Sequence, residues 1–235
     1  MQPESIATPV GAVVDPPPRC VPPRPSVFEG ERVRLEPVDP ARHAAALFAG
    51  SHGNAAAPEL WAYMGYGPFA DEAAMRAWLA GCAASQDPLF FTVIARGSGE
   101  PVGMASLMRT DAANGVIEVG NIWYAPKVQR TALPTEAMLL LFAHVFEELG
   151  YRRLEWKCNA LNEPSRRAAL RFGFTYEGTF RQHMVVKGRN RDTAWFSMLD
   201  SEWPAIGRAM RAWVSMDNFD AAHRQIRSLA SLRQR

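Results

Sequence analysis

Apolar residues recur along the chain in two different patterns. Short β-branched and aromatic runs, bounded by Gly, Asn or Pro, predict strands at 32–38, 89–95, 101–108, 116–124, 151–158, 174–181 and 193–199. Helical spacing and helix end signals predict helices at 40–49, 72–84, 134–149, 164–172, 202–214 and 218–231. This order predicts an α+β domain with a mixed central sheet of about seven strands, flanked by helices and followed by a C-terminal helical extension.

Several short polar signals fix where these elements begin and end. Asp39 precedes Pro40 and Asp71 precedes the helix 72–84, and both aspartates suit the N-cap position. The segment 97–100 reads Gly-Ser-Gly-Glu and predicts a hairpin turn, as does Asn114-Gly115. The strands on either side of these turns are therefore expected to be antiparallel neighbours.

Residues 1–27 differ from the rest in composition. Prolines at 16–18, 22, 23 and 25 disfavour both helix and sheet. We expect a flexible or polyproline-II arm, which serves as a linker or decoration rather than as a ligand for a proline-recognition module. The predicted organisation is thus an arm at 1–27, a main domain at 28–204 and the helical extension at 205–235.

Composition narrows the class of protein. Of the 235 residues, 48% are hydrophobic and 21% are charged, which is typical of a globular chain. A net charge of +2 gives no indication of nucleic-acid binding. The three cysteines have no disulfide or metal-ligand spacing, so we expect reduced thiols, no metal and a cytoplasmic location. No apolar run reaches the ~18–20 residues of a membrane span, and no secretory signal precedes the domain.

The most informative stretch is 117–150, which reads as a strand, a turn and a largely buried helix. The turn at 129–135 ends at the helix N-terminus, where unpaired N–H groups and the helix dipole suit a phosphate or pyrophosphate. Pro134 fits the first helical position. Every strand–turn–helix connection has such groups, so an ordinary connection is the alternative interpretation.

Motifs along this stretch and beyond it resemble a known family. Tyr124-x-Pro126 followed by Gln129-x-x-Ala132-x-Pro134 is similar to the acetyl-CoA loop, Q/R-x-x-G-x-G/A, of the GNAT superfamily of N-acetyltransferases. Two positions depart from that loop, because Ala132 replaces a Gly and Pro134 has no N–H to offer a phosphate.

The second part of the resemblance lies further along the chain. The segment 162–174, with Asn162, Ser165 and the final Gly-Phe, resembles the N-x-x-S…G-F segment of the RimJ/RimL-like branch. Glu177-Gly178-Thr179, Arg181 and Arg191-Asp192 then follow in the family's order, so that the resemblance covers roughly 28–204.

This resemblance implies a GNAT fold in which the fourth and fifth strands splay apart to admit the pantetheine arm of acetyl-CoA. It implies acetyl-CoA as acyl donor and no metal. The residues implied to bind the cofactor are Tyr124, Gln129, Arg130, Thr131, Ala132, Thr135, Asn162 and Ser165.

Acetyl transfer to an amine needs a base, an oxyanion donor and a group to protonate the thiolate. Glu118, a lone carboxylate in an apolar strand beside the turn, is the candidate base, and its alternative is a Glu paired with a basic neighbour. By resemblance, the Tyr124 N–H would bind the oxyanion. Many GNAT enzymes have a Tyr acid where this chain has Ala169, so Ser165 is the candidate acid. The alternatives for Ser165 and Asn162 are helix N-terminal capping roles.

The acceptor site is predicted from aromatic and basic residues. Trp61, Tyr63, Trp123 and Trp195 can form an aromatic pocket, with an aromatic plug over the core as the alternative, and Arg181 and His183 can orient an acidic group. The expected acceptor is a primary amine, either a protein N-terminus or a small amine, amino acid or aminoacyl compound. A homodimer follows from the resemblance alone. The competing hypothesis is a non-catalytic or weakly catalytic acyl-CoA-binding module, motivated by Ala132, Pro134 and Ala169.

Overall fold

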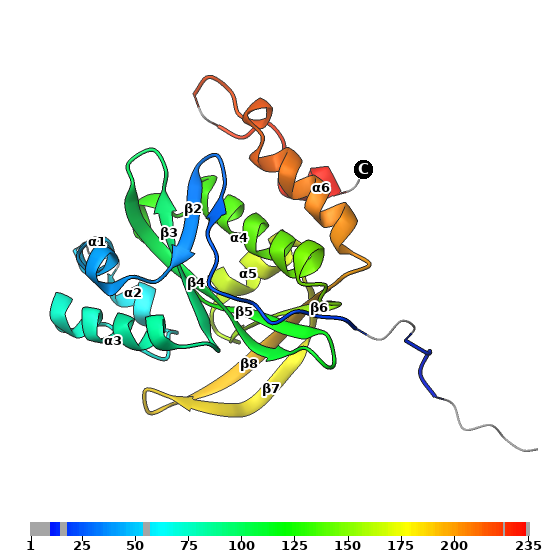
Figure 1. Cartoon of the computed structure of the whole chain (residues 1–235), viewed down its shortest axis with the longest axis horizontal. Coiled ribbons are helices and arrows are strands. Elements are labelled where there is room, and N and C mark those ends of the chain that lie inside the picture. The colour runs from blue at the N-terminus through cyan, green and yellow to red at the C-terminus, as the bar shows by residue number, and fades with distance from the viewer. Residues whose placement is uncertain (1–9, 15–17, 54–56, 223, 234–235) are drawn as a thin grey trace, which may run out of the picture.

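An eight-stranded mixed sheet forms the centre of the computed structural model, which describes residues 10–14, 18–53, 57–222 and 224–233 (Figure 1). The strands lie in the order β1-β2-β3-β4-β5-β6-β8-β7. Their bounds are β1 Phe28–Glu29, β2 Val33–Pro37, β3 Leu89–Ala95, β4 Glu100–Asp111, β5 Val116–Tyr124, β6 Arg153–Asn159, β7 Thr175–Val186 and β8 Arg189–Leu199. The expected α+β fold with a mixed sheet is confirmed, and the short β1 is the strand that the pattern did not predict.

The sheet consists of two antiparallel halves. Strands β1 to β5 pair antiparallel in chain order, and β6, β8 and β7 form the second antiparallel set. The two halves meet where β5 pairs parallel with β6. A parallel connection needs a crossover, and here the segment between β5 and β6 contains a helix packed on the sheet.

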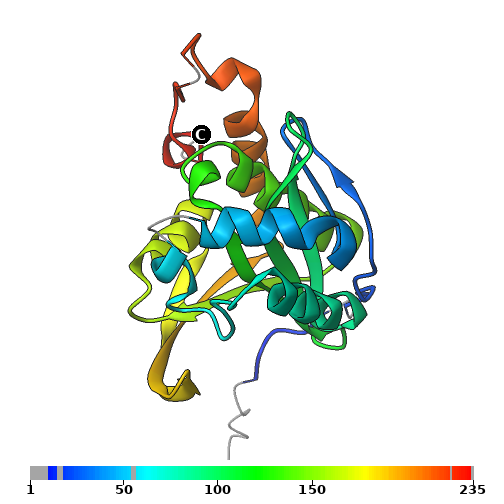
Figure 2. The same ribbon diagram turned by 90° about the vertical axis from the view of Figure 1, so that its left-hand side faces the viewer.

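Helices cover both faces of the sheet (Figures 1 and 2). One group consists of α1 Pro40–His52, α2 Ala57–Trp61 and α3 Glu72–Ala84. The other group consists of α4 Leu133–Ala143, α5 Glu163–Phe172, α6 Trp203–Val214 and the short α7 Leu229–Arg233. Asp39 and Asp71 cap α1 and α3 as predicted, since their side chains accept from the N–H groups of Ala41 and Ala74. In the described ranges, no helix has the length and apolar character that a membrane crossing requires.

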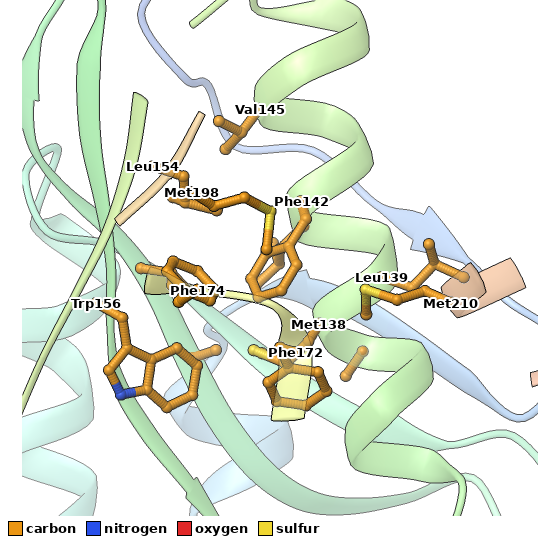
Figure 3. Packing of buried hydrophobic residues seen from close by; sticks show 14 of the residues in the cluster. Met138, Leu139, Phe142, Val145, Leu154, Trp156, Phe172, Phe174, Met198 and Met210 are labelled. Atoms are coloured by element: carbon orange, nitrogen blue, oxygen red, sulfur yellow. The ribbon is translucent and has the colours of Figure 1, made fainter. Parts of the chain in front are cut away.

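The larger core lies between the sheet and α4, α5 and α6. Phe142 of α4 is fully buried and meets Phe174 and Phe172 edge-on, with ring centroids 5.5 and 5.8 Å apart (Figure 3). Helix α4 is buried on most sides, as its composition predicted, and continues into a π-helical turn at His144–Glu148. A second, smaller core beneath α1 and α3 contains Trp61 and Trp123.

A buried carboxylate ties α4 to the first strands. Glu136, in the first turn of α4, accepts hydrogen bonds from the backbone N–H groups of Glu31, Arg32 and Val33 at 3.0, 2.7 and 2.9 Å. A Cβ on Gly30 would lie 2.8 Å from the Glu136 Cδ, so glycine permits this close approach. The N-terminus of α4 is thereby fixed against the β1–β2 turn.

The last two strands are longer than predicted. The sequence suggested strands at 174–181 and 193–199, whereas β7 and β8 extend towards each other and leave Lys187 and Gly188 as the turn. The Lys187 ammonium donates to the Trp61 carbonyl at 2.8 Å, so the tip of this hairpin reaches the end of α2. The hairpin therefore forms a wall beside the loop that follows α2.

The predicted helix at 218–231 is wrong. The described part of this segment contains a 3-10 turn at Met216–Asn218, irregular chain and α7. The buried Asn218 side chain donates to the carbonyls of Trp213 and Arg227 and accepts from the Arg227 N–H. These side-chain bonds replace helical backbone bonds, which is how asparagine competes with helix formation.

The arm and the C-terminal extension both contact the main domain. In the described part of the arm, the Val21 N–H donates to the Leu149 carbonyl at 3.0 Å and the Cys20 thiol donates to the Gly150 carbonyl at 3.1 Å. Residues 1–9 and 15–17 of the predicted arm lie outside the described residues. At the other end, α6 places Trp203, Ile206 and Met210 in the larger core. The boundary at residue 204 remains a prediction, and α6 packs as part of the core.

We predict that one buried histidine makes stability depend on pH. His43 is 1% exposed, its Nδ1 accepts from the Asp39 N–H, and its Nε2 lies 2.8 Å from Glu36. Burial lowers the pKa of His43 below its ordinary value of 6.5. Below pH 6.5, His43 therefore takes up a proton in the unfolded chain but stays neutral in the folded chain. The free energy of unfolding falls as the pH drops from 6.5 towards the pKa of His43 in the folded chain. The slope is at most about 1.4 kcal/mol per pH unit.

Urea unfolding at pH 7.5, 6.5 and 5.5 measures this effect. The His43→Gln variant should show a weaker loss between pH 6.5 and 5.5 than the unmodified chain, because its side chain takes up no proton. Exposed His183→Gln serves as the control. Equal slopes for the unmodified chain and His43→Gln would refute the assignment.

Candidate active site

A gap in the sheet lies where its two halves meet. The parallel ladder between β5 and β6 runs from the pair Val116–Arg153 to the pair Val119–Trp156 and then ends. The remainder of both strands, 120–124 and 157–159, continues beyond it without pairing to each other. Main-chain groups that a continued ladder would use are left for another partner. This is the splay that the resemblance implied.

The Tyr124 peptide group faces this gap. The Ala125 N–H donates to the Val102 carbonyl of the β4 side at 2.8 Å. Because backbone groups alternate in direction along a strand, the N–H and C=O of Tyr124 point away from β4. The Tyr124 carbonyl indeed accepts from Gln129 Nε2 at 3.0 Å. The Tyr124 N–H thus points towards the gap, where an oxyanion donor is needed.

The turn after β5 presents free N–H groups at the start of α4. Arg130 has a left-handed backbone with φ of 62°, and Thr131 Oγ1 donates to the Val128 carbonyl at 2.7 Å. Among the described residues, the N–H groups of Arg130, Ala132 and Thr135 have no hydrogen-bond acceptor. These groups and the helix dipole fit an anionic phosphate without any further side chain.

Two details of this turn differ from expectation. The helix begins at Leu133, so Pro134 occupies the second helical position and not the first. The Thr135 side chain is 2% exposed, and its Oγ1 accepts from Arg171 at 3.1 Å. The Thr135 hydroxyl is therefore turned into the protein, and only its backbone N–H remains at the turn.

Asn162 and Ser165 lie at the N-terminus of α5. Asn162 is the N-cap, since its Oδ1 accepts from the Ser165 N–H at 3.2 Å, as its capping alternative proposed. The capping alternative for Ser165 is wrong, because its hydroxyl accepts from Trp156 Nε1 at 3.0 Å. Burial raises the pKa of the nearby Cys158 thiol, and the Ser165 hydroxyl partly offsets that rise. Ser165 is thus fixed beside the end of the β5–β6 ladder.

Glu118 lies on the other face of the sheet and is ion-paired. Its side chain is 6% exposed, and its Oε2 lies 2.9 Å from Lys157 Nζ and 3.2 Å from Arg109 NH1. This is the alternative in which Glu118 pairs with basic neighbours. Both partners are cations, and Lys157 is as deeply buried as Glu118 itself.

The sequence did not reveal that Lys157 and Glu155 belong to this site. Lys157 Nζ lies 2.7 Å from Glu155 Oε2 and 3.9 Å from the centroid of the Trp195 ring, and the Lys157 side chain is 5% exposed. Glu155 pairs with Glu118 in the ladder, so the two carboxylates lie side by side with the ammonium between them. Alternation of charged and apolar residues along β6 was the available signal, because it places Arg153, Glu155 and Lys157 on one face.

The predicted acceptor residues separate into two groups. Trp61 and Trp123 are 0% and 3% exposed, with ring centroids 5.2 Å apart, so they pack in the core as the plug alternative proposed. Tyr63 is half-buried, and its hydroxyl donates to the Leu161 carbonyl at 3.1 Å. The loop after α2 therefore bridges the β6–α5 loop on one side and, through Trp61, the β7–β8 hairpin on the other.

Trp195, His183 and Arg181 lie on that hairpin. The Trp195 ring stacks beside Phe180 with centroids 4.5 Å apart, and His183 Nδ1 lies 3.0 Å from Thr193 Oγ1. Arg181 is exposed, and both it and His183 line an open hollow where β7 bulges. Of the predicted acceptor residues, Trp195 is the one that contacts the Glu118–Lys157 cluster.

Comparison with known proteins agrees with this geometry. Residues 32–175 match the domain family described as "Acetyltransferase (GNAT) domain". A crystal structure of a GCN5-related N-acetyltransferase from Brucella melitensis is 49% identical, with a TM-score of 0.90, covering 93% of this chain and 98% of that chain.

Two further relatives carry names from the RimJ/RimL-like branch or from ribosomal acetylation. YdaF of Bacillus subtilis, named as a ribosomal N-acetyltransferase, is 34% identical over 105 residues, which are 45% of this chain and 57% of YdaF. The chain thus matches little more than half the length of that relative. RimJ of Mycobacterium smegmatis, solved in complex with CoA-disulfide, is 23% identical with a TM-score of 0.63, covering 73% of this chain and 84% of that chain, and shares the fold.

We predict that Lys157→Met destabilises the fold by about 3–5 kcal/mol, because it removes the buried ammonium that separates two adjacent carboxylates and leaves each with one arginine at its edge. Guanidinium unfolding followed by fluorescence measures the change. The control is Lys127→Met, whose partner Glu100 lies 2.5 Å away in an exposed pair and whose loss should cost less than about 1 kcal/mol. Adding Glu155→Gln to Lys157→Met should restore part of the loss. Equal costs for the two lysines would contradict the role of the buried cluster.

Proposed function

The chain belongs to the GNAT acetyltransferase family, and from this premise we propose that it transfers the acetyl group of acetyl-CoA directly to a primary amine. The observation that carries the proposal is the gap beyond Val119 and Trp156, with the Tyr124 N–H directed into it and Glu118 on the face of the sheet opposite α4. A thioester carbonyl placed there would meet an N–H donor, and an amine approaching from the face opposite α4 would pass Glu118.

The donor would bind along the helix face of the gap. Its phosphates would lie at the N–H groups of Arg130, Ala132 and Thr135, and its pantetheine arm would pair with the unpaired strand groups. Gln129 supports this turn through its bond to the Tyr124 carbonyl, and Thr131 through its bond to Val128. Asn162 caps the helix that presents Ser165.

The reaction forms one bond and breaks one bond at the acetyl carbon. The amine nitrogen bonds to the carbonyl carbon, the carbon–sulfur bond breaks, and the oxyanion formed in between is stabilised by the Tyr124 N–H. The amine's proton passes to the carboxylate of Glu118, which acts as the general base. The leaving thiolate takes a proton from water, directly or through the Ser165 hydroxyl, which gives up its own proton as it receives one from that water. Burial raises the pKa of the Tyr124 hydroxyl, which makes that phenol a poor acid.

A protein N-terminus is one acceptor that this site would suit, since YdaF is named as a ribosomal N-acetyltransferase. A small amine is the second candidate acceptor. The loop after α2 contacts both the β6–α5 loop and the β7–β8 hairpin, and these contacts would restrict the space beside the gap. A homodimer remains a prediction from the resemblance. The competing function is an acyl-CoA-binding module, which the Pro134 substitution at the turn favours by removing one phosphate donor.

We predict that Glu118→Gln lowers kcat by about 10²–10⁴-fold, because the amide cannot accept the amine's proton. Acetyl-CoA turnover with a panel of amines and peptides, followed by thiol release, measures the loss. The matched control is Glu155→Gln, which changes the neighbouring carboxylate of the same Lys157 ammonium but lies on β6. If Glu118→Gln retains full activity, or if both variants lose activity equally, Glu118 is not the base.

We also predict that coenzyme A binding depends on the Ala132 N–H. Ala132 has φ of −74°, so proline fits there while removing the N–H. Losing a hydrogen bond to a charged phosphate should raise the dissociation constant of acetyl-CoA by about 10–100-fold. Calorimetric titration measures this change, with Ala132→Gly as the control that keeps the N–H. Unchanged affinity in Ala132→Pro would place the phosphates elsewhere, and absence of binding in the unmodified chain would refute the proposed donor.

A further inference from the structure

Arg191 stands out among the cations on the face of the sheet opposite α4. It is half-buried on β8, and its Nε donates to Thr193 Oγ1 at 3.3 Å. We propose that Arg191 binds a carboxylate of the acceptor. The acceptor is then an amine that carries a carboxylate group close to its amino group. This inference rests on the proposed function, because it names the substrate class of the same site.

Strand register places Arg191 beside the reacting groups. On β8, Trp195 pairs with Lys157 and Thr193 pairs with Asn159 of β6. Residues two apart on a strand share a face, so Arg191 lies on the face that also presents Lys157 and Glu118. Burial is the main cause that lowers the pKa of Arg191, and Cys158, Glu118 and Arg109 are each also close enough to shift that pKa.

The cations that surround Glu118 and Glu155 already have carboxylate partners. Lys157 pairs with Glu118 and Glu155, and Arg109 pairs with Glu118. Arg153 lies 2.9 Å from Glu155 and 2.5 Å from Glu177. Within the described part of the chain, Arg191 has no carboxylate within 4 Å. A half-buried guanidinium has five N–H donors, and one bond to a threonine leaves most of them available to an anion.

The anion that would bind Arg191 belongs to the acceptor and not to acetyl-CoA. The phosphates of acetyl-CoA would lie at the turn leading into α4, which packs on the opposite face of the sheet from Glu118. The pantetheine arm carries no charge for Arg191 to neutralise. An acceptor whose amine faces Glu118 would therefore direct a nearby carboxylate to Arg191.

Bidentate binding of a carboxylate by arginine also orients the group that carries it. Arg191 would accordingly be a positioning residue for the amine, and its loss should raise KM for acidic acceptors more than it lowers kcat. Two sources share this chemistry: a free amino acid, whose carboxylate lies next to the amine, and a peptide whose first residue is acidic.

Paired acceptors separate the two sources. Alanine and alaninamide differ only in the carboxylate of a free amino acid, and peptide amides that begin with Glu or Gln differ only in an acidic side chain. In one of these pairs the carboxylate-bearing member should have a kcat/KM about 10–100-fold higher, and Arg191→Gln should abolish that preference through KM. The matched control is Arg189→Gln, an exposed arginine two residues earlier on the same strand, which should keep the preference.

A binding measurement distinguishes this inference from the proposed reaction. With coenzyme A present, calorimetry with N-acetylalanine and N-acetyl-glutamyl peptide amide should show binding that Arg191→Gln weakens about 10-fold or more, while acetyl-CoA affinity stays unchanged. Such binding without turnover of any amine would support the carboxylate site and refute the transferase function. No preference in either acceptor pair, or equal losses for both members in Arg191→Gln, would overturn the inference even if amines are acetylated.

Discussion

The short parallel ladder between β5 and β6 is the constraint on which the rest of the structure depends. It covers the pairs from Val116–Arg153 to Val119–Trp156, and in the described part of the chain the two antiparallel half-sheets have no other strand pairing between them. A longer ladder would close the gap and use the main-chain groups that a thioester arm needs. Without any ladder, the halves would be joined only by helix packing. The crossover through α4 therefore has to hold the strands together at one end while allowing them to separate at the other.

The two faces of this junction are held together in different ways, one by apolar packing and the other by ion pairs. Towards α4, the strands present Ile117, Leu154 and Trp156 to the larger core. On the opposite face, Glu118, Glu155 and Lys157 lie together with little exposure, and the Trp195 ring covers the ammonium. Such a cluster is stable only while every member keeps its partner.

The sequence was most informative where structure depends on neighbouring residues. Asp39 and Asp71 correctly indicated where their helices begin. The motif segments lie on the strand, turn and helix that the resemblance implied. It was least informative where distant segments decide. The buried role of Lys157 comes from β8 and Trp195, which a charged residue on an alternating strand cannot show by itself. The irregular chain after Asn218 depends on its side-chain bonds to Trp213 and Arg227, so a good helical pattern there was misleading.

The contacts of Arg32 have a consequence for how the chain reaches this structure during synthesis. Its guanidinium donates to the carbonyl of Val214, which lies 182 residues later in the chain, at 2.6 Å. The backbone N–H groups of the same turn have Glu136 as their acceptor. The first strands consequently leave the ribosome long before the residues that complete them. Until then their edge and the apolar face beneath α4 are exposed, and intermediates of this kind are prone to aggregate. Nascent chains of this protein should thus need chaperone protection until α6 has left the ribosome.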